Sequence, residues 1–549
     1  MTYLHLSTIN HNHDKNYYYI YECTGSRKGK KVIINKNRVG TYDPVNKIAI
    51  FNDDYLEKLN NIDLLKQKLP VGYEIVSQYD YIKRHSNLDL SNCTIKDFGF
   101  FYLMEHISNQ IGLIDSLSSA LPVLWKDVFM LSCYLVSSGE PFQHCADWIN
   151  DSEGYNVGEM SSQYISSLLR KITEVERNKF YQYWAENMLK QEYFALDVSS
   201  TSSYSELIDD VEFGYNRDKE KLPQINICML MGEKSLLPIY IMNYQGSLND
   251  VKILENTINL LSSITKTDKY SLVMDKGFYS EKNISFLLNK HKNMRFIISV
   301  PFTCNLAKEQ LSKYRDAIFS ISNAIIHNDK SLYTISDKYF WNNVNTLNVY
   351  NFYNHIKYTN VFDNNLRDAL QAQETALKNP LLYYKNSDYL KFLDFKQLKN
   401  SNDQFIITIS DDKLKKLSRN AGWLSFISND NLSNNEILNI YRNKDIVEKG
   451  FLRLKGSLDL YKTIVKSQEA LNNKIFISFT ALILLSKIHQ IMISNNLYKN
   501  FTITKLINET KRFKKIMIND CIVYSATTKI QNDIFTAFNV DLSTINLKK

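Results

Sequence analysis

The sequence lacks the features that mark secreted, disulfide-stabilised and membrane-spanning proteins. Its seven cysteines are scattered without a Cys-x-x-Cys pair, and their odd number argues against a disulfide framework. The most apolar run, IFISFTALILLS at 475–486, has 12 residues and stops at Lys487. Since a bilayer span needs about 20 residues, we expect a buried helix there. The N-terminus MTYLHLSTINHNHDK is polar and has no signal-peptide pattern, so we expect a cytoplasmic protein with reduced thiols.

A strong charge bias is also missing. The 549 residues are 44% hydrophobic and 23% charged, which is typical of globular proteins rather than disordered ones. The chain has 66 Lys and Arg residues against 58 Asp and Glu residues, a net charge of +8. This modest excess permits a polyanionic partner without requiring one. The length predicts about three or four domains, and we find no internal repeat.

The first 190 residues show a hairpin pattern followed by a helical pattern. Residues 16–50 predict two strands around a basic turn, GSRKGKK. This turn fits either contact with DNA phosphates or a solvated loop, and composition does not decide between them. From residue 94 to about 190 apolar residues recur at helical spacing, with Pro122 and Pro141 as breaks. A helical region of this size can bind DNA or a protein partner, and the sequence does not choose.

The next hundred residues predict an α/β fold. Consecutive strand patterns, typical of an antiparallel meander, lie at 193–200, 222–231 and 236–244. They are followed by a helix, a strand, a helix and a strand at 249–264, 271–275, 281–291 and 295–300. Three strands and then helix–strand–helix–strand is the order of a ribonuclease-H-like mixed sheet. We therefore predict a ribonuclease-H-like catalytic core.

The predicted core is interrupted by an insertion and flanked by helical regions. Residues 301–435 mix strand-like segments with one polar helical stretch, so we expect a β-rich insertion subdomain. The predicted regions are 1–90 (basic β-hairpin and DNA-binding region), 91–190 (helical domain), 191–300 (first part of the core), 301–435 (insertion), 436–480 (core helix) and 481–549 (C-terminal helical region).

Within the core helix, the stretch IYRNKDIVEKGFLRLKGSLDL at 440–460 combines an apolar face with a polar stripe. At about 100° per residue, Tyr441, Lys444, Glu448 and Lys455 fall within roughly 60° of one another. Periodicity alone would also fit a solvated face with an ordinary i, i+4 ion pair. Carboxylates elsewhere in the predicted core distinguish a functional stripe from a solvated face.

Two aspartates occupy strand positions that favour a functional site. Asp197 lies inside the apolar strand ALDVSS, where an unneutralised carboxylate is costly, and Asp275 ends the strand LVMD. These strands are neighbours in a ribonuclease-H-like sheet, and the later helix can bring Glu448 to the same edge. Three carboxylates at one point repel each other, and a pair of divalent cations removes this repulsion and serves phosphodiester displacement. Oxygen ligands favour Mg²⁺ or Mn²⁺, and Lys444 and Lys455 are then placed to hold phosphates.

The spacing Y-x2-K-x3-E-x6-K resembles the YREK signature of bacterial insertion-sequence DDE transposases of the insertion sequence four superfamily. It is formed by Tyr441, Lys444, Glu448 and Lys455. The family usually has Arg where Lys444 stands, and Arg442 lies nearby. Lysine keeps the positive charge but loses the bidentate fork of arginine.

Other blocks extend the resemblance over about residues 190–480. They are ALDVSS, FGYNRDKEKLPQI at 213–225 and VMDKGFYS, and their order is most similar to the sixteen-thirty-four branch of the superfamily. The resemblance implies a cut-and-paste transposase that binds terminal inverted repeats and target DNA, as a homodimer, in the bacterial cytoplasm at the nucleoid. It implies that two Mg²⁺ ions, or Mn²⁺, are held by the catalytic residues Asp197, Asp275 and Glu448. The implied DNA contacts are Tyr441, Arg442, Lys444 and Lys455.

Two alternatives stay open at this stage: a silent or domesticated copy that binds DNA without cutting it, and another two-metal nuclease on the same fold. Four further residues are noted without a functional assignment. Trp341 and Trp423 lie in the insertion and are interpreted as core residues, although related enzymes use a tryptophan there to stabilise a flipped base. Arg217 and Asp218 are interpreted as structural.

Overall fold

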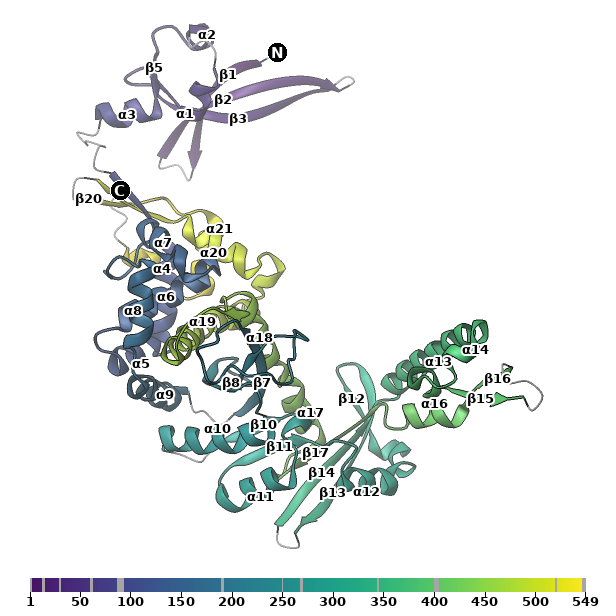
Figure 1. Cartoon of the computed structure of the whole chain (residues 1–549). Helices are drawn as coiled ribbons and strands as arrows, with labels where there is room; N and C mark the ends of the chain where they lie inside the picture. Colours follow the sequence, from purple (N-terminus) through teal and green to yellow (C-terminus); the bar gives the residue numbers. More distant parts are fainter. Residues whose placement is uncertain are drawn as a thin grey trace. The chain divides into compact units, whose positions relative to one another are not determined.

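The computed structural model divides the chain into two compact units (Figure 1). The first comprises residues 1–96, 513–526 and 543–549, and the second comprises 97–512 and 527–542. The residues described are 2–11, 15–28, 31–59, 63–85, 93–188, 192–248, 250–266, 270–342, 345–398, 404–518 and 521–545.

The first unit contains a five-stranded sheet in the order β1-β2-β3-β4-β5. Its strands are β1 (Thr2–His11), β2 (Lys15–Lys28), β3 (Lys31–Asp43), β4 (Ile48–Phe51) and β5 (Glu74–Ser77), with short helices α1 (Asp53–Glu57), α2 (Asp63–Lys66) and α3 (Gln78–His85). The antiparallel pair β2–β3 confirms the two predicted strands. The tip of the predicted basic turn, Gly29 and Lys30, lies outside the described residues. A second sheet in the order β20-β19-β6 is formed by β6 (Cys93–Asp97), β19 (Lys514–Ile518) and β20 (Cys521–Tyr524).

The second unit begins with helices, as the periodicity predicted. They are α4 (Gly99–Gln110), α5 (Leu113–Ala120), α6 (Trp125–Ser138), α7 (Cys145–Asp151), α8 (Ser162–Lys171) and α9 (Glu174–Met188). Pro122 lies in the link between α5 and α6, and Pro141 follows α6. Both helices end before these residues because proline cannot continue a regular helix.

Of these helices, α4, α6 and α8 pack against α19 (Gln468–Ser494), which contains the apolar run of the sequence. By length and composition α19 could cross a membrane, but 78% of its most apolar 18-residue window is buried inside the protein. Asn473 ties it to α8 by donating hydrogen bonds to the carbonyls of Leu169 (2.9 Å) and Ile172 (2.8 Å). The predicted buried helix is thus confirmed, and α20 (Ile503–Lys511) and α21 (Lys529–Ala537) follow it.

The central sheet has the predicted ribonuclease-H-like order, β9-β8-β7-β10-β11. Its elements are β7 (Tyr193–Ser203), β8 (Gln224–Gly232), β9 (Pro238–Gln245), α10 (Asp250–Thr265), β10 (Ser271–Met274), α11 (Glu281–Lys290) and β11 (Arg295–Ser299). Strands β7, β8 and β9 form the antiparallel meander, and β10 and β11 run parallel to β7. The parallel strands need crossovers, which α10 and α11 supply (Figure 1).

The insertion continues the central sheet and is mixed rather than mostly β. Strands from its beginning and its end, in the order β17, β14, β13 and β12, extend the sheet beyond β11. Its elements are α12 (Asn305–Tyr314), β12 (Ala324–His327), β13 (Lys330–Trp341), β14 (Asn345–Tyr353), α13 (His355–Lys378), α14 (Pro380–Tyr383), α15 (Ser387–Leu390), β15 (Leu393–Gln397), β16 (Phe405–Ile409), α16 (Asp411–Ser418) and β17 (Trp423–Ser428). The helical content was underestimated because α13 buries only Ala369 and Ala376 fully, so its apolar periodicity is weak.

Candidate active site

The polar stripe lies on two consecutive helices instead of the single straight helix that was predicted. Helix α17 (Asn434–Asn443) ends at Lys444, and α18 (Asp445–Gly456) begins directly after it. At the junction the Lys444 amide bonds to the carbonyl of Tyr441 (3.2 Å), one residue short of the α-helical partner. This tighter turn shifts the angular spacing that an ideal helix would give.

Helix α18 lies directly on the central sheet. Its contacts are with β7 and β8, and Gly450 makes the close approach possible. A Cβ at this position would lie 2.4 Å from Met231 Sδ and 2.8 Å from Met229 Cε. The apolar face predicted for the stretch is confirmed, because Val447, Phe451 and Leu454 are buried.

The two aspartates are neighbours in the sheet. Strands β7 and β10 pair in parallel with Leu196 opposite Met274, so the next residues along, Asp197 and Asp275, emerge side by side. Asp197 accepts a hydrogen bond from its neighbouring amide, that of Val198, at 2.8 Å. Asp275 caps a turn of 3₁₀-helix by accepting the amide of the following residue at 2.7 Å.

Lys444 brings Glu448 into the same cluster. Its ammonium nitrogen lies 3.7 Å from Asp197 Oδ2 and 3.6 Å from Glu448 Oε1. The lysine side chain is only 4% exposed and its Nζ has no hydrogen-bond partner among the described residues, whereas the Glu448 side chain is 62% exposed. A buried ammonium therefore bridges a carboxylate of the sheet and one on the helix by charge alone.

Tyr441 connects the cluster to Asp275. Its hydroxyl donates to Asp275 Oδ1 at 3.1 Å, and its ring packs against Phe426 with centroids 4.4 Å apart. Burial, followed by the charge of Asp275, raises the pKa of Tyr441 above its usual value, so the hydroxyl stays a donor. One ring face is covered, and the hydroxyl positions the carboxylate.

Lys455 lies farther along α18 and is engaged by a loop after β7. Its Nζ is 2.6 Å from Asp218 Oδ2. The preceding residue, Arg217, makes two hydrogen bonds of 2.9 Å to the Asp250 carboxylate. Burial raises the pKa of Asp197, and the charge of Arg217 offsets part of that rise. The structural interpretation of Arg217 and Asp218 was therefore incomplete, since both act on candidate site residues. The block FGYNRD was visible, but its partners are more than 30 residues away in sequence.

The remaining candidates lie apart from the carboxylates. Arg442 is next to the insertion, where burial and then the charge of Arg442 lower the pKa of the buried His327. Trp341 is buried and donates to Ser285 Oγ at 3.2 Å. Trp423 is buried in a small apolar cluster with Tyr353. Both tryptophans fit the interpretation as core residues.

Burial and charge oppose each other at Asp197. Burial raises the pKa of Asp197, while the positive charges of Lys444 and Arg217 lower it and Asp275 raises it further. The net effect is a raised pKa, so the ionised carboxylate is incompletely compensated. A further cation at this position would be attracted by the remaining negative charge.

The donor set fits a hard divalent cation. Asp197, Asp275 and Glu448 offer only carboxylate oxygens, and no thiol or imidazole joins them in the contacts described above. In the part of the chain that the structure describes, no three acidic, histidine or cysteine side chains are already arranged around one metal position. Lys444 stands between two of the three carboxylates.

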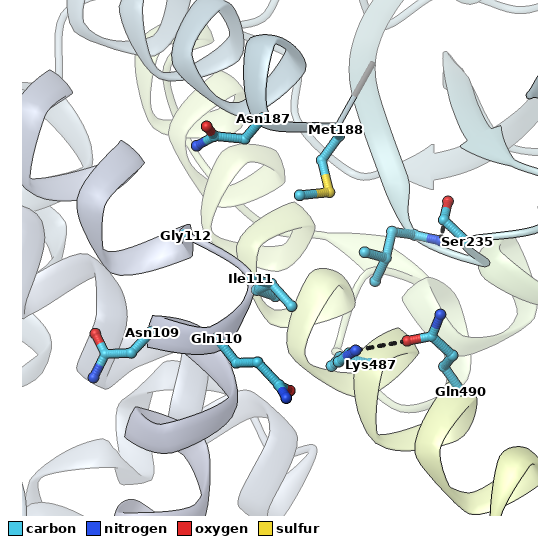
Figure 2. A pocket seen from close by; sticks show the side chains of 10 residues that line it. Asn109, Gln110, Ile111, Gly112, Asn187, Met188, Ser235, Lys487 and Gln490 are labelled. Carbon is cyan, nitrogen blue, oxygen red and sulfur yellow. Dashed lines mark hydrogen bonds between the residues drawn. The ribbon is translucent and has the colours of Figure 1, made fainter. Parts of the chain in front are cut away.

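A cavity among the described residues lies elsewhere. It has a volume of about 460 Å³ and lies among α4, α9, the β8–β9 turn and α19 (Figure 2). Its lining includes Asn109, Gln110 and Asn187, and Lys487 donates to Gln490 Oε1 at 2.8 Å. None of the predicted site residues lines this cavity, so it is separate from the carboxylate cluster.

Comparison with known proteins agrees with this geometry. The sequence model of the family described as "Transposase DDE domain" matches residues 190–484, more than half of the chain. The chain belongs to the DDE transposase domain family. The matched segment of the DDE transposase domain includes Asp197, Asp275, Glu448 and the insertion between the last two.

A solved structure also aligns with this DDE transposase domain chain. It is titled "Cryo-EM structure of piggyBac transposase synaptic complex with hairpin DNA (SNHP)" and is 12% identical, with a TM-score of 0.33 over 74% of this chain and 70% of that chain. No match was found among curated proteins. The family membership confirms the resemblance at the level of a DDE transposase, whose domains generally depend on a divalent metal.

Proposed function

We propose that the protein is a cut-and-paste transposase of the insertion sequence four superfamily, most similar to its sixteen-thirty-four branch. It binds the terminal inverted repeats of its own element and acts on target DNA. It works as a homodimer in the DNA complex, in the bacterial cytoplasm at the nucleoid. The proposal is supported by family membership and by the contacts between the YREK-like residues and the two strand aspartates.

One observation carries the proposal. Lys444 on the helix junction lies within 4 Å of both Asp197 and Glu448, and Tyr441 from the same stripe holds Asp275. A solvated helix face would place these side chains in water, not against two neighbouring strands of a ribonuclease-H-like sheet.

The proposed roles are metal binding by three carboxylates and positioning of one of them by a tyrosine. Asp197, Asp275 and Glu448 would hold two Mg²⁺ ions, with Mn²⁺ as a substitute. When bound, such ions activate the attacking oxygen and stabilise the leaving oxygen of a phosphodiester displacement. Water releases a 3′-hydroxyl at the element end, and this hydroxyl then displaces a phosphodiester oxygen in the target strand. Tyr441 fixes the orientation of the Asp275 carboxylate throughout.

The basic side chains provide binding rather than bond breaking. Lys455 lies beyond the carboxylates on α18 and can exchange Asp218 for a DNA phosphate. Lys444 balances the carboxylates with a point charge, where the family's usual arginine would offer a planar fork. Arg442 faces the insertion and would contact DNA on that side.

The two alternatives make different demands on the chain. A silent copy requires no intact catalytic set, yet all three carboxylates and both lysines of the stripe are present. A different two-metal nuclease does not require the YREK-like stripe or the long insertion. Inverted repeats that flank the gene would favour the transposase, and their absence would favour one of the alternatives.

A nicking assay tests the proposal. Purified protein is added, with Mg²⁺ or Mn²⁺, to a supercoiled plasmid that carries the gene with its natural flanks. Glu448→Gln is compared with Asp445→Asn, a matched control in the first turn of the same helix whose carboxylate pairs with Lys449 at 2.8 Å. Cuts at the element borders that Glu448→Gln abolishes and Asp445→Asn preserves are expected.

The other outcomes identify the alternatives. Binding at the borders without metal-dependent cutting indicates a silent DNA-binding copy. Cutting that ignores the borders indicates a generic two-metal nuclease. Cutting by Glu448→Gln at the rate of the unmodified protein contradicts the assignment of the third carboxylate.

A further inference from the structure

We infer that the end of β7 and the short strand β18 (Lys462–Thr463) form a stacking platform for unpaired DNA bases, made by Tyr204, Lys462 and Tyr461. This inference rests on the proposed function, because it assigns a binding surface for the DNA strand that the enzyme opens. None of the three residues belongs to the YREK-like stripe or to the carboxylate cluster.

Strand pairing fixes the platform. β18 runs parallel to the end of β7, with Lys462 opposite Ser202 and Thr463 opposite Ser203. Tyr204 therefore follows the last paired residue of β7, and Tyr461 precedes the first paired residue of β18. The two tyrosines thus flank this two-residue parallel ladder at its opposite ends, with Lys462 inside it.

Both tyrosines are partly exposed, and their hydroxyl groups are held by neighbouring side chains. Tyr204 is 55% exposed and Tyr461 is 46% exposed. The Tyr461 hydroxyl donates to Glu220 Oε1 at 3.3 Å, and Lys462 Nζ lies 3.0 Å from the same oxygen. Lys462 also donates to the Tyr204 hydroxyl at 3.3 Å. Aromatic rings that are oriented in advance lose little conformational entropy when a base stacks on them.

Lys462 supplies the charge between the rings. Its Nζ lies 5.5 Å from the ring centroid of Tyr204 and 5.7 Å from that of Tyr461. Aromatic faces with an interleaved cation are the pattern that binds single strands without sequence preference, since every base has a π-face and every nucleotide a phosphate. A protein partner would be expected to need a larger continuous apolar surface.

Exposed aromatic side chains are concentrated here. Among the described residues, the exposed Tyr and Phe side chains are Tyr3, Tyr79, Tyr204, Phe213, Tyr215, Phe319, Phe340, Tyr461 and Tyr498. Four of them, Tyr204, Phe213, Tyr215 and Tyr461, belong to the platform or to the loop that follows it. This loop also carries Asp218, the partner of Lys455, so the platform is continuous with the proposed DNA contact of α18.

The platform is separated from the carboxylates by a defined length. Seven residue steps along the chain lead from Asp197 to Tyr204, a distance of about 23 Å at 3.3 Å per residue. This equals roughly seven stacked nucleotides at 3.4 Å each. A strand that begins at the carboxylates therefore needs about seven unpaired nucleotides to reach Tyr204.

The test uses the full chain, EDTA to prevent cleavage, and a duplex with a single-stranded oligothymidine overhang that carries one 2-aminopurine. An overhang of about ten nucleotides is compared with one of two. The variants are Tyr204→Leu, Tyr461→Leu, and the conservative Tyr204→Phe and Tyr461→Phe. Phe340→Leu is the matched control, an exposed aromatic (68%) on β13 outside the platform.

We expect 2-aminopurine fluorescence to be quenched only with the long overhang. Each leucine variant should bind it roughly tenfold more weakly, while the phenylalanine variants and Phe340→Leu should bind as the unmodified protein does. A 5-iodouracil in the overhang should crosslink to the peptide that contains Tyr204 or Tyr461. This second measurement uses the unmodified protein and does not depend on the folding of any variant.

Two results would overturn the platform and leave the proposed transposase intact. In the first, the protein binds the duplex, but the leucine variants bind the long-overhang substrate as tightly as the unmodified protein does. The other is crosslinking of the overhang only to peptides outside the platform. If the unmodified protein binds neither duplex nor overhang, the proposed function fails and the platform fails with it.

Discussion

The ion pair between Lys444 and Glu448 allows a sharp separation of stability from activity. The two partners lie 3.6 Å apart, but the lysine is 4% exposed and the glutamate 62%. Removing the charge from each partner should therefore have unequal effects. We compare Glu448→Gln with Lys444→Met, because each substitution keeps the approximate length of the side chain.

Glu448→Gln should hardly change the free energy of unfolding. A half-exposed i, i+4 pair contributes about 0.5 kcal/mol or less, and Lys444 keeps Asp197 at 3.7 Å. For a protein of this size the melting temperature should fall by less than about 2 °C. Under the proposed function Glu448 holds a metal ion, and loss of such a carboxylate removes several kcal/mol of transition-state stabilisation, so cleavage should fall by at least roughly a hundredfold.

Lys444→Met should destabilise the fold. At 3.7 Å and an effective dielectric constant of about 20, the attraction between Lys444 and Asp197 is about 4.5 kcal/mol before desolvation is subtracted. Since Asp197 is largely buried and would lose its nearest cation, a loss of about 2–4 kcal/mol is expected.

Denaturant unfolding of both variants, followed by circular dichroism, measures the difference, and the nicking assay measures activity. Asp445→Asn serves again as the control for an exposed i, i+4 pair on α18. The reasoning is refuted if Glu448→Gln loses as much unfolding free energy as Lys444→Met. It is also refuted if Lys444→Met is as stable as the unmodified protein.

Three further predictions concern other parts of the molecule. Asp218→Asn frees Lys455 from its ion pair, so DNA should bind more tightly and the salt dependence of binding should steepen by about one counterion. Anisotropy titrations measure this slope, and an unchanged slope would contradict the proposed exchange of Asp218 for a DNA phosphate. Burial, with a smaller effect of Arg453, lowers the pKa of His489 to about 4. The folded state therefore favours the neutral ring, and this contribution to stability is complete above about pH 6.5 and is lost as the pH falls toward 4. In His489→Gln the melting temperature should depend less on pH between 6.5 and 4. Trp341→Phe should lose a hydrogen bond to α11 and about 1 kcal/mol of stability in a urea melt, with cleavage unchanged.

The core and the placement of its aspartates could be predicted from the sequence because the signals are local. Each strand of the meander begins with or contains a short apolar run, and Asp197 and Asp275 stand at the only acidic positions within or directly after their strands. Once the strand order is known, the parallel register brings them together without further information.

Contacts that close over long sequence distances could not be predicted. The partner of Lys455 is Asp218, which lies on an irregular loop without a periodic signal. The tight turn at Lys444 interrupts no hydrophobic pattern, so an ideal helix fitted the sequence equally well. The strands of the insertion were recognisable one by one, but pairing of β17 with β11, which extends the central sheet, leaves no trace in local composition.

Lys444 explains how the carboxylates of the cluster coexist in one fold. Asp197 lies beside Asp275, and after the larger effect of burial the charge of Asp275 further raises the pKa of Asp197. The ammonium of Lys444 offsets this charge from 3.7 Å without forming a hydrogen bond to either of its carboxylates. A guanidinium in this position would form a planar, hydrogen-bonded fork and would hold the carboxylates in one arrangement. A lysine acts as a point charge on a flexible stem, so it can stabilise the cluster and still yield its place to a divalent cation. A lysine in this position is therefore compatible with metal binding, and Lys444→Arg should retain the fold while changing the metal concentration that cleavage requires.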